Sequence, residues 1–234
     1  MTENKFIEEL KKINIELNQK QLEQLKKYYE LLIEWNEKIN LTAITEKEQV
    51  YLKHFYDSLT INKVYELNKK IKVCDMGTGA GFPGIVLKIV FPNLQIELVD
   101  SLMKRIKFLD LVIKELELKD ITTNHARIEE YSIKHIEEYD LITARAVTNL
   151  RMLTEISSQA LKIKGKMIFL KGDSKEEIEE SLNTLKILNL KLEKVEKFTL
   201  PIENSNRSLI IISKENKTPK KYPRKFSEIK NKPL

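Results

Sequence analysis

Several residue types that mark particular classes of protein are scarce in this chain. Cys74 is the only cysteine among 234 residues, so no internal disulfide and no CxxC metal site can form. The histidines, His54, His125 and His135, are too scattered to predict a zinc cluster, and we expect no metal. No apolar run approaches the ~18 residues of a membrane-spanning helix, and the N-terminus lacks a signal pattern. We therefore expect a soluble, cytoplasmic protein, acting as a monomer, with no membrane partner.

The composition that remains favours a globular, basic protein. Lysine and arginine together number 41 against 35 acidic residues, a formal charge of +6, which favours an anionic partner such as nucleic acid. The length suits one large domain with an extension. The chain changes character near residue 70, and we predict a helical N-terminal extension at 1–69, a ligand-binding domain at 70–214 and a basic tail at 215–234.

The extension shows helical spacing of apolar residues, with a second helical stretch expected at 46–67. Beyond it, short apolar runs alternate with helical patterns, which predicts an α/β fold with a mostly parallel sheet covered on both faces. The last two runs are too close for a crossover helix and predict an antiparallel hairpin. The expected strands are 71–76, 95–100, 121–126, 139–144, 165–171, 191–200 and 207–214, and the expected helices between them are 84–91, 102–118, 149–163 and 175–189.

The sequence VCDMGTGAGFPG, residues 73–84, gathers four of the six glycines directly after the first predicted strand. A glycine-rich turn between a strand and a helix lets a ligand approach bare backbone amides at the helix N-terminus. The pattern GxGxxG at 79–84 occurs in dinucleotide-binding proteins. Starting two residues earlier, Asp75, Gly77, Gly79 and Gly81 resemble the first motif of Rossmann-like S-adenosylmethionine methyltransferases. A carboxylate at Asp75 would repel a pyrophosphate but suits a cationic cofactor.

Two further positions fit a cofactor that carries a ribose and an adenine. Asp100 ends the second predicted strand, 23 positions after Gly77, close to the spacing at which an acid reaches ribose hydroxyls. Ile128 and Glu129 follow the third strand, where methyltransferases of this type usually bound the adenine ring. An apolar side chain for the face of the ring and a polar one for its edge would suit that position.

The end of the fourth predicted strand, TARAV, bears on the acceptor of the methyl group. It lacks the Asn/Asp-Pro-Pro-aromatic motif of enzymes that methylate exocyclic amines, and Cys74 lies within a strand, where it cannot serve as a nucleophile for pyrimidine carbon 5. Guanine N7 has a free lone pair and needs only positioning. Arg145 is then the expected catalytic residue, because its planar fork can hold a phosphate or guanine O6.

Taken together, the motifs resemble a known family. DMGTGAGFPGIVLKIVFP, VDSLMKRIKFL and YDLITARAV, with NLTAI and HFYDSL upstream, look like the glucose-inhibited division protein B family of bacterial ribosomal RNA methyltransferases. The resemblance implies transfer from S-adenosylmethionine to N7 of a guanine in small-subunit (16S) ribosomal RNA. It also implies cofactor contact at Gly77, Phe82, Ile128, Glu129 and Arg145, with Asp100 at the ribose.

The expected partner is therefore ribosomal RNA or a precursor of the small ribosomal subunit. Basic residues on four segments, with Tyr222 and Phe226 interleaved in the tail, could meet its phosphates and stack on an unpaired base. Three alternatives stay open: a small-molecule methyltransferase, an NAD-dependent oxidoreductase, and a non-catalytic RNA-binding protein. The predicted RNA contacts are Lys104, Arg105, Lys171, Arg207, Lys220, Lys221 and Arg224.

Overall fold

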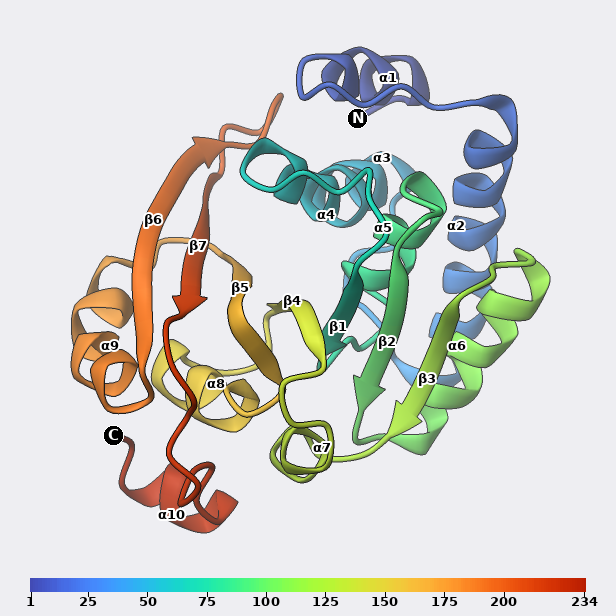
Figure 1. Ribbon diagram of the computed structural model, residues 1–234. Coiled ribbons are helices and arrows are strands. Elements are labelled where there is room, and N and C mark those ends of the chain that lie inside the picture. Colours follow the sequence, from blue (N-terminus) through green and yellow to red (C-terminus); the bar gives the residue numbers. More distant parts are fainter.

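The structure is a computed structural model that describes residues 1–234, and it is built on one seven-stranded sheet (Figure 1). The strand order is β3-β2-β1-β4-β5-β7-β6. Strands β1 to β5 are parallel, and β7 runs antiparallel to both β5 and β6. The predicted α/β class and terminal hairpin are confirmed. The strands are β1 (Lys72–Met76), β2 (Gln95–Asp100), β3 (Ile121–His125), β4 (Tyr139–Arg145), β5 (Leu161–Lys171), β6 (Leu190–Thr199) and β7 (Asn206–Lys214).

Helices cover both faces of this sheet. Helices α2 and α6 lie on one side in Figure 1, and α8 and α9 lie on the other. A π-helical segment, η1 (Tyr51–Tyr56), and a 3₁₀ turn, η2 (Thr60–Lys63), extend the short helices near residue 55. The α-helices are α1 (Glu3–Lys11), α2 (Gln19–Ile39), α3 (Lys47–Val50), α4 (Asp57–Leu59), α5 (Gly84–Val90), α6 (Met103–Glu115), α7 (Ile128–Lys134), α8 (Leu150–Ser157), α9 (Lys175–Ile187) and α10 (Phe226–Asn231).

The hydrophobic core is split by the sheet into two clusters. Successive strand residues point to opposite faces, so Val73 packs in one cluster and Cys74 in the other. The larger cluster of 41 buried residues joins the sheet to the N-terminal helices, α5 and α6. The smaller, of 23, joins it to α7, α8, α9 and the C-terminal tail. The near-continuous apolar strands of the sequence follow from burial on both faces.

The N-terminal helices share the core of the sheet. Asn18 caps α2 and forms a reciprocal capping box with Gln21, which fixes where the helix begins. The Gln21 side chain also donates to the carbonyls of Ile89 and Val90 at the end of α5, both at 3.0 Å. These bonds satisfy carbonyls that a helix C-terminus leaves free. The hydrophobic core therefore runs across the boundary that the sequence places at residue 69.

Three details differ from the sequence-based prediction. Helix α7 was not predicted, because its seven residues are too few to show helical periodicity and, unlike the equally short α5, it does not follow a glycine-rich turn with a proline at the helix start. Helix α8 ends at Ser157 rather than 163, and the following residues begin β5, where Leu161 pairs with Tyr139 of β4. Strand pairing there overrides the local helical pattern. In addition, α1 precedes the predicted helical stripe and packs through Phe6 and Leu10.

The C-terminal tail is folded against α8. Tyr222 and Ile229 are buried, and Gln159 donates to the carbonyl of Tyr222 at 2.8 Å. Glu155, itself buried, accepts from Arg224 Nε at 2.8 Å and from its terminal nitrogen at 2.7 Å. This paired geometry is the strong form of a carboxylate–guanidinium contact.

None of the helices is both long enough and apolar enough to cross a bilayer.

Candidate functional site

The glycine-rich loop joins β1 to α5 at the carboxyl edge of the sheet. Gly77, Gly79 and Gly81 all have positive φ, at 72°, 63° and 101°, a region that other residues adopt at a cost. A Cβ at Gly77 would lie 2.7 Å from a methyl group of Val147, so the β4 loop approaches too closely for any side chain. A Cβ at Gly79 would meet nothing within 4 Å. Gly79 therefore presents bare backbone to open space.

Asp75, the acid of the predicted motif, is buried beneath this loop. One of its carboxylate oxygens accepts from the Gly84 amide at 2.8 Å and from the Thr78 hydroxyl at 2.6 Å. Its other oxygen has no hydrogen-bond partner. Burial raises the pKa of Asp75 to about 6, and the bonds from Thr78 and Gly84 oppose that shift. The carboxylate thus shapes the loop from within, rather than standing in the open cleft.

Asp100 lies at the end of β2 and also holds the loop. Its carboxylate accepts from the Gly79 amide at 3.0 Å and, through the other oxygen, from the Leu102 amide at 2.9 Å. Arg105 is 3.2 Å away and forms an ion pair with it. Two carboxylate oxygens offer about four acceptor positions, so this residue retains capacity for a further donor. Asp100 therefore lies beside the glycine loop, and its contact with a ribose stays a prediction.

Ile128 and Glu129, which we expect beside the adenine, form the start of α7. Ile128 begins α7, and its Cδ1 would be 3.5 Å from a Cβ at Gly77, so it borders the loop. Glu129 is partly exposed and pairs with Arg127 at 3.0 Å. The guanidinium of Arg127 lies over the ring of Phe226 in the tail, 4.9 Å from the ring centre. The structure therefore brings the loop, β2 and α7 together around one region.

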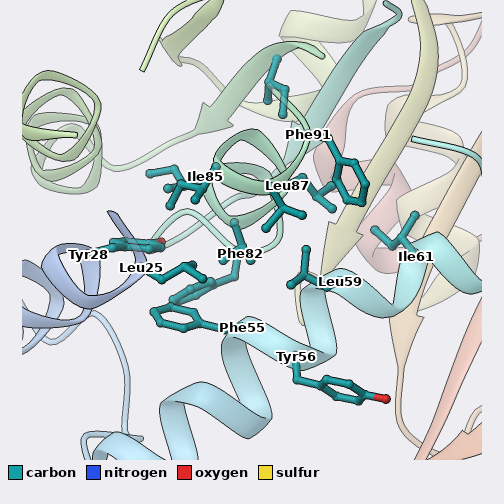
Figure 2. Packing of buried hydrophobic residues seen from close by; sticks show 14 of the residues in the cluster. Leu25, Tyr28, Phe55, Tyr56, Leu59, Ile61, Phe82, Ile85, Leu87 and Phe91 are labelled. Carbon is teal, nitrogen blue, oxygen red and sulfur yellow. The ribbon is translucent and has the colours of Figure 1, made fainter. Parts of the chain in front are cut away.

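The side chain of Phe82, a residue expected at the cofactor, packs in the core. It is only 5% exposed. Figure 2 shows it reaching from the glycine loop toward Tyr28 and Phe55, with ring centres 5.4 Å and 6.2 Å away. The Tyr28 hydroxyl also donates to the carbonyl of Ala80 at 2.5 Å. Helix α2 and η1 thus hold the loop through aromatic contacts, and the Phe82 side chain faces the core rather than the cleft.

Arg145 ends β4 and is the centre of a second cluster. Its guanidinium donates to the Lys53 carbonyl at 2.7 Å and to Asp57 at 3.3 Å, and it lies over Phe82 at 5.0 Å. The next residue, Ala146, has a φ of 55°, so the chain turns sharply after the strand. The guanidinium of Arg145 also contacts His54, whose Nδ1 is 3.0 Å from an Arg145 terminal nitrogen. These partners fix the plane of the fork.

The contact with Arg145 sets the proton arrangement of His54. An arginine only donates, so Nδ1 accepts and Nε2 carries the proton, 2.9 Å from the Thr42 hydroxyl. Burial, and then the charge of Arg145, lower the pKa of His54 to about 3. The imidazole is also stacked on Phe82, with centres 4.5 Å apart. His54 is therefore neutral near pH 7 and positions Arg145.

Asp57 joins this cluster to a second arginine. It is 4% exposed, and its free oxygen is 3.4 Å from Arg207 Nε, an ion-pair distance without hydrogen-bond geometry. Burial raises the pKa of Asp57, and the two guanidinium groups oppose that shift. Arg145 and Arg207 line the same cavity of about 330 Å³, together with Ile44, Lys53, His54, Asp57, Ala146, Leu170, Lys171 and Gly172.

Four of the seven predicted RNA contacts are engaged within the protein. Arg105 pairs with Asp100, Arg207 with Asp57, and Arg224 with Glu155. Lys171 donates to the Thr148 carbonyl at 2.7 Å and to Glu177 at 2.8 Å. All three guanidinium nitrogens of Arg224 donate hydrogen bonds within the protein, to Glu155 and to the Lys232 carbonyl, so we count it as a structural residue of the tail. The three whose side chains are exposed are Lys104, Lys220 and Lys221.

Sequence reasoning did not single out Thr42, Lys53 or Asp57 as functional residues. It interpreted His54, a lone histidine, as a structural residue. Thr42 lies in NLTAI and Asp57 in HFYDSL, motifs that served only to establish the family resemblance, and Lys53 directly precedes the second of them. Arg145 contacts Lys53, His54 and Asp57, which are 88 to 92 positions away, a distance that no local pattern reports. Thr42 reaches the cluster through His54. No group of three His, Cys, Asp or Glu side chains is arranged to hold a metal ion.

Solved structures of other proteins share this fold, and some of them are named methyltransferases. One is a putative sarcosine dimethylglycine methyltransferase from Galdieria sulphuraria, with a TM-score of 0.56 and 14% identity. The match covers 74% of this chain and 89% of that one. Another is M. jannaschii TYW2 in complex with AdoMet, with a TM-score of 0.51 and 15% identity over 62% and 68% of the two chains. At such low identity these matches show the shared fold alone.

Sequence relatives are much closer. A ribosomal RNA small subunit methyltransferase G from Lysinibacillus sphaericus is 50% identical over 228 residues, 96% of each chain. The protein of the same name from Bacillus cytotoxicus is 50% identical over 214 residues, 90% of each chain. The family model GidB, described as rRNA small subunit methyltransferase G, matches residues 21–210. This chain therefore belongs to the GidB family.

Proposed function

We propose that the protein methylates N7 of a guanine in small-subunit (16S) ribosomal RNA, at the carboxyl edge of the sheet where the glycine loop and Arg145 lie. Family membership confirms the enzyme class, a methyltransferase of ribosomal RNA that uses S-adenosylmethionine. The observation that carries the site assignment is the position of Arg145, whose fork is fixed by four partners at the end of β4. We place the reaction in the cytoplasm.

The residues around the glycine loop fit S-adenosylmethionine. Gly79 offers open backbone, Asp100 has spare acceptor capacity for ribose hydroxyls, and Ile128 provides an apolar border. Glu129 lies beside Ile128 at the start of α7, where it can accept from the adenine edge. Asp75 contributes negative charge beneath the loop, which suits a ligand with cationic ammonium and sulfonium groups. Gly77 and Gly81 shape the loop so that these groups converge.

The proposed chemistry requires no general base. When bound, S-adenosylmethionine supplies a methyl group on a cationic sulfur, and guanine N7 accepts it through a lone pair that is free at neutral pH. No side chain has to remove a proton, and none of the cluster is arranged to do so: His54 Nδ1 is occupied by Arg145. The protein contributes alignment and exclusion of water.

Arg145 is the residue that we expect to orient the base. Its contacts use three of the five N–H donors of a guanidinium, and the remaining two can reach guanine O6 or a phosphate. Asp57 forms ion pairs with both Arg145 and Arg207. The net charge of these three residues is therefore +1 rather than +2. That balance suits a neutral base attached to an anionic backbone.

The direct test is to map N7-methylguanine in small-subunit ribosomal RNA from cells with and without this protein. We expect one modified guanine to lose its methyl group in the deletion, and to regain it with the wild-type gene. Arg145→Lys should restore little methylation, because the point charge survives without the planar fork. An unchanged N7-methylguanine profile in the deletion strain would refute the proposal.

The absence of a base can be tested separately with saturating RNA and cofactor. The single-turnover rate should show no acidic limb across about pH 6 to 8.5, because no group needs to lose a proton. His54→Gln keeps a side chain that can accept from Arg145 and serves as the matched variant. A rate that rises tenfold per pH unit in the wild type, but not in one carboxylate or histidine variant, would show that a base is required.

A further inference from the structure

A second cavity lies beside the one that contains Arg145. It measures about 480 Å³ and lies between the carboxyl end of β5 and the β6–β7 hairpin. Gly172 and Arg207 belong to the walls of both cavities, so the two are neighbours at one edge of the sheet. Both volumes fall in the range of ligand pockets, about 300–1,000 Å³. The remaining lining residues of the second cavity are Asp173, Ser174, Lys197, Phe198, Thr199, Asn206 and Ser208.

The charge of the second cavity favours an anion. Lys197 is exposed at the end of β6 and has no carboxylate within ion-pair distance. The Nε of Arg207 forms an ion pair with Asp57, and one terminal nitrogen donates to the Asn206 carbonyl. The other terminal nitrogen has no partner within the protein. Against these two cations the lining holds one acid, Asp173, which is exposed. The Phe198 ring adds the single apolar surface, with Lys63 4.3 Å from its centre.

The floor of this cavity is rigid. Ser174 and Ser208 are both buried, and their hydroxyl oxygens are 2.8 Å apart in a hydrogen bond. Ser208 also donates to the Gly172 carbonyl at 2.7 Å, which ties β7 to the loop after β5. The cationic side chains therefore project from a fixed framework, as a pre-organised site requires.

We propose that this second cavity holds the nucleotide adjacent to the target guanine. Lys197 and Arg207 contact its phosphate, and Phe198 packs against its base. The inference rests on the proposed function, which places the target guanine at Arg145 in the neighbouring cavity. Single-stranded RNA is commonly recognised by this combination of aromatic stacking and cationic contacts to the backbone. The shared residue Arg207 would then lie between the two nucleotides.

The test compares Lys197→Ala with Lys191→Ala, an exposed lysine near the start of the same strand. Substrates are naked small-subunit RNA and small ribosomal subunits, both from cells that lack this protein. Lys197→Ala should raise the KM for RNA about tenfold, as expected for a lost charge-assisted contact. The slope of log KM against log salt should fall by about 0.7, the value for one phosphate of a single strand. Lys191→Ala should match the wild type.

Phe198→Leu keeps an apolar side chain and removes the ring, and it should also raise the KM for RNA while S-adenosylmethionine affinity stays at the wild-type value. A wild-type KM and salt slope in Lys197→Ala would overturn the inference. An effect on assembled subunits but not on naked RNA would also overturn it, because the occupant would then be a ribosomal protein. If the wild-type protein transfers no methyl group to either substrate, the proposed function itself has failed.

Discussion

Two regions at the carboxyl edge of the sheet, the glycine loop and the Arg145 cluster, have opposite electrostatic character. Around the ends of β1 and β2 the buried charges are carboxylates, Asp75 and Asp100, and backbone amides of the glycine loop donate to them. Around the end of β4 the charges are two partly exposed guanidinium groups, Arg145 and Arg207, which share one buried carboxylate, Asp57. This difference in charge is what we expect if a cationic methyl donor binds at the first region and an anionic RNA at the second. Four predictions test this division.

The largest expected effect concerns Asp75. Burial raises its pKa to about 6 from an ordinary value of 3.8, so the folded state binds this proton more tightly than the unfolded state. Protonated Asp75 therefore contributes to the free energy of unfolding. This contribution is present below pH ~4 and is lost as the pH rises through 6, and it amounts to about 3 kcal/mol for a pKa shift of this size. Urea denaturation of the wild type and Asp75→Asn from pH 4 to 7 measures it. Parallel pH profiles for the two proteins would show that Asp75 ionises normally.

Arg145→Lys should reduce kcat/KM for RNA on the order of 100-fold, because misplacing a reacting base by about 1 Å has that cost. Affinity for S-adenosylmethionine should change little if the two regions are independent. Steady-state kinetics and calorimetry on the same preparation give both values. Arg224→Lys, in the tail, is the control for loss of an arginine fork. Equal losses of cofactor affinity and turnover in Arg145→Lys would mean that the regions are coupled.

Asp100→Ala should weaken S-adenosylmethionine binding by about 2 kcal/mol, the usual range for losing a hydrogen bond to a charged group. The change also frees the Gly79 and Leu102 amides, so Asp100→Asn, which keeps an acceptor, separates the two contributions. Calorimetry should show the larger loss in the alanine variant. Unchanged affinity in both variants would remove Asp100 from the cofactor site.

The smallest effect is expected from the tail. Lys220 and Lys221 are exposed, whereas Arg224 is bound to Glu155. Replacing both lysines by alanine should lower the salt slope of RNA binding by at most about 0.7 per residue and leave cofactor affinity unaltered. This double variant is preferable to a truncation, which would leave the Glu155 carboxylate buried and unpaired. A wild-type slope would leave the tail with a packing role only.

Local sequence patterns anticipate which residues meet around the glycine loop but not which residues meet around Arg145, for a physical reason. Glycine spacing and strand ends are local features, and they placed Gly77, Gly79, Asp100 and Ile128 together correctly. The partners of Arg145 come from residues 53 to 57, on a π-helical segment and a short helix. No local pattern specifies which face of that segment meets β4, since tertiary packing decides it.

Charge patterning could not place the cationic side chains, for a related reason. A count of cations cannot distinguish an arginine that faces solvent from one that is bound to a buried carboxylate, as Arg224 is to Glu155 and Arg105 is to Asp100. The direction of the Phe82 side chain could not be predicted either, because a residue within a ligand-binding loop can point toward the ligand or into the core. Its burial became evident only from the positions of Tyr28 and Phe55.

The aromatic contact between the glycine loop and the N-terminal helices carries an evolutionary consequence. Tyr28, Phe55 and Phe82 come from three separate segments, yet each ring occupies space that the other two define. A larger or smaller ring at one position leaves a gap or a clash at the others. We therefore expect these three positions to covary among relatives. A chimera that exchanges residues 1–69 between distant relatives should fold only when all three positions come from the same parent.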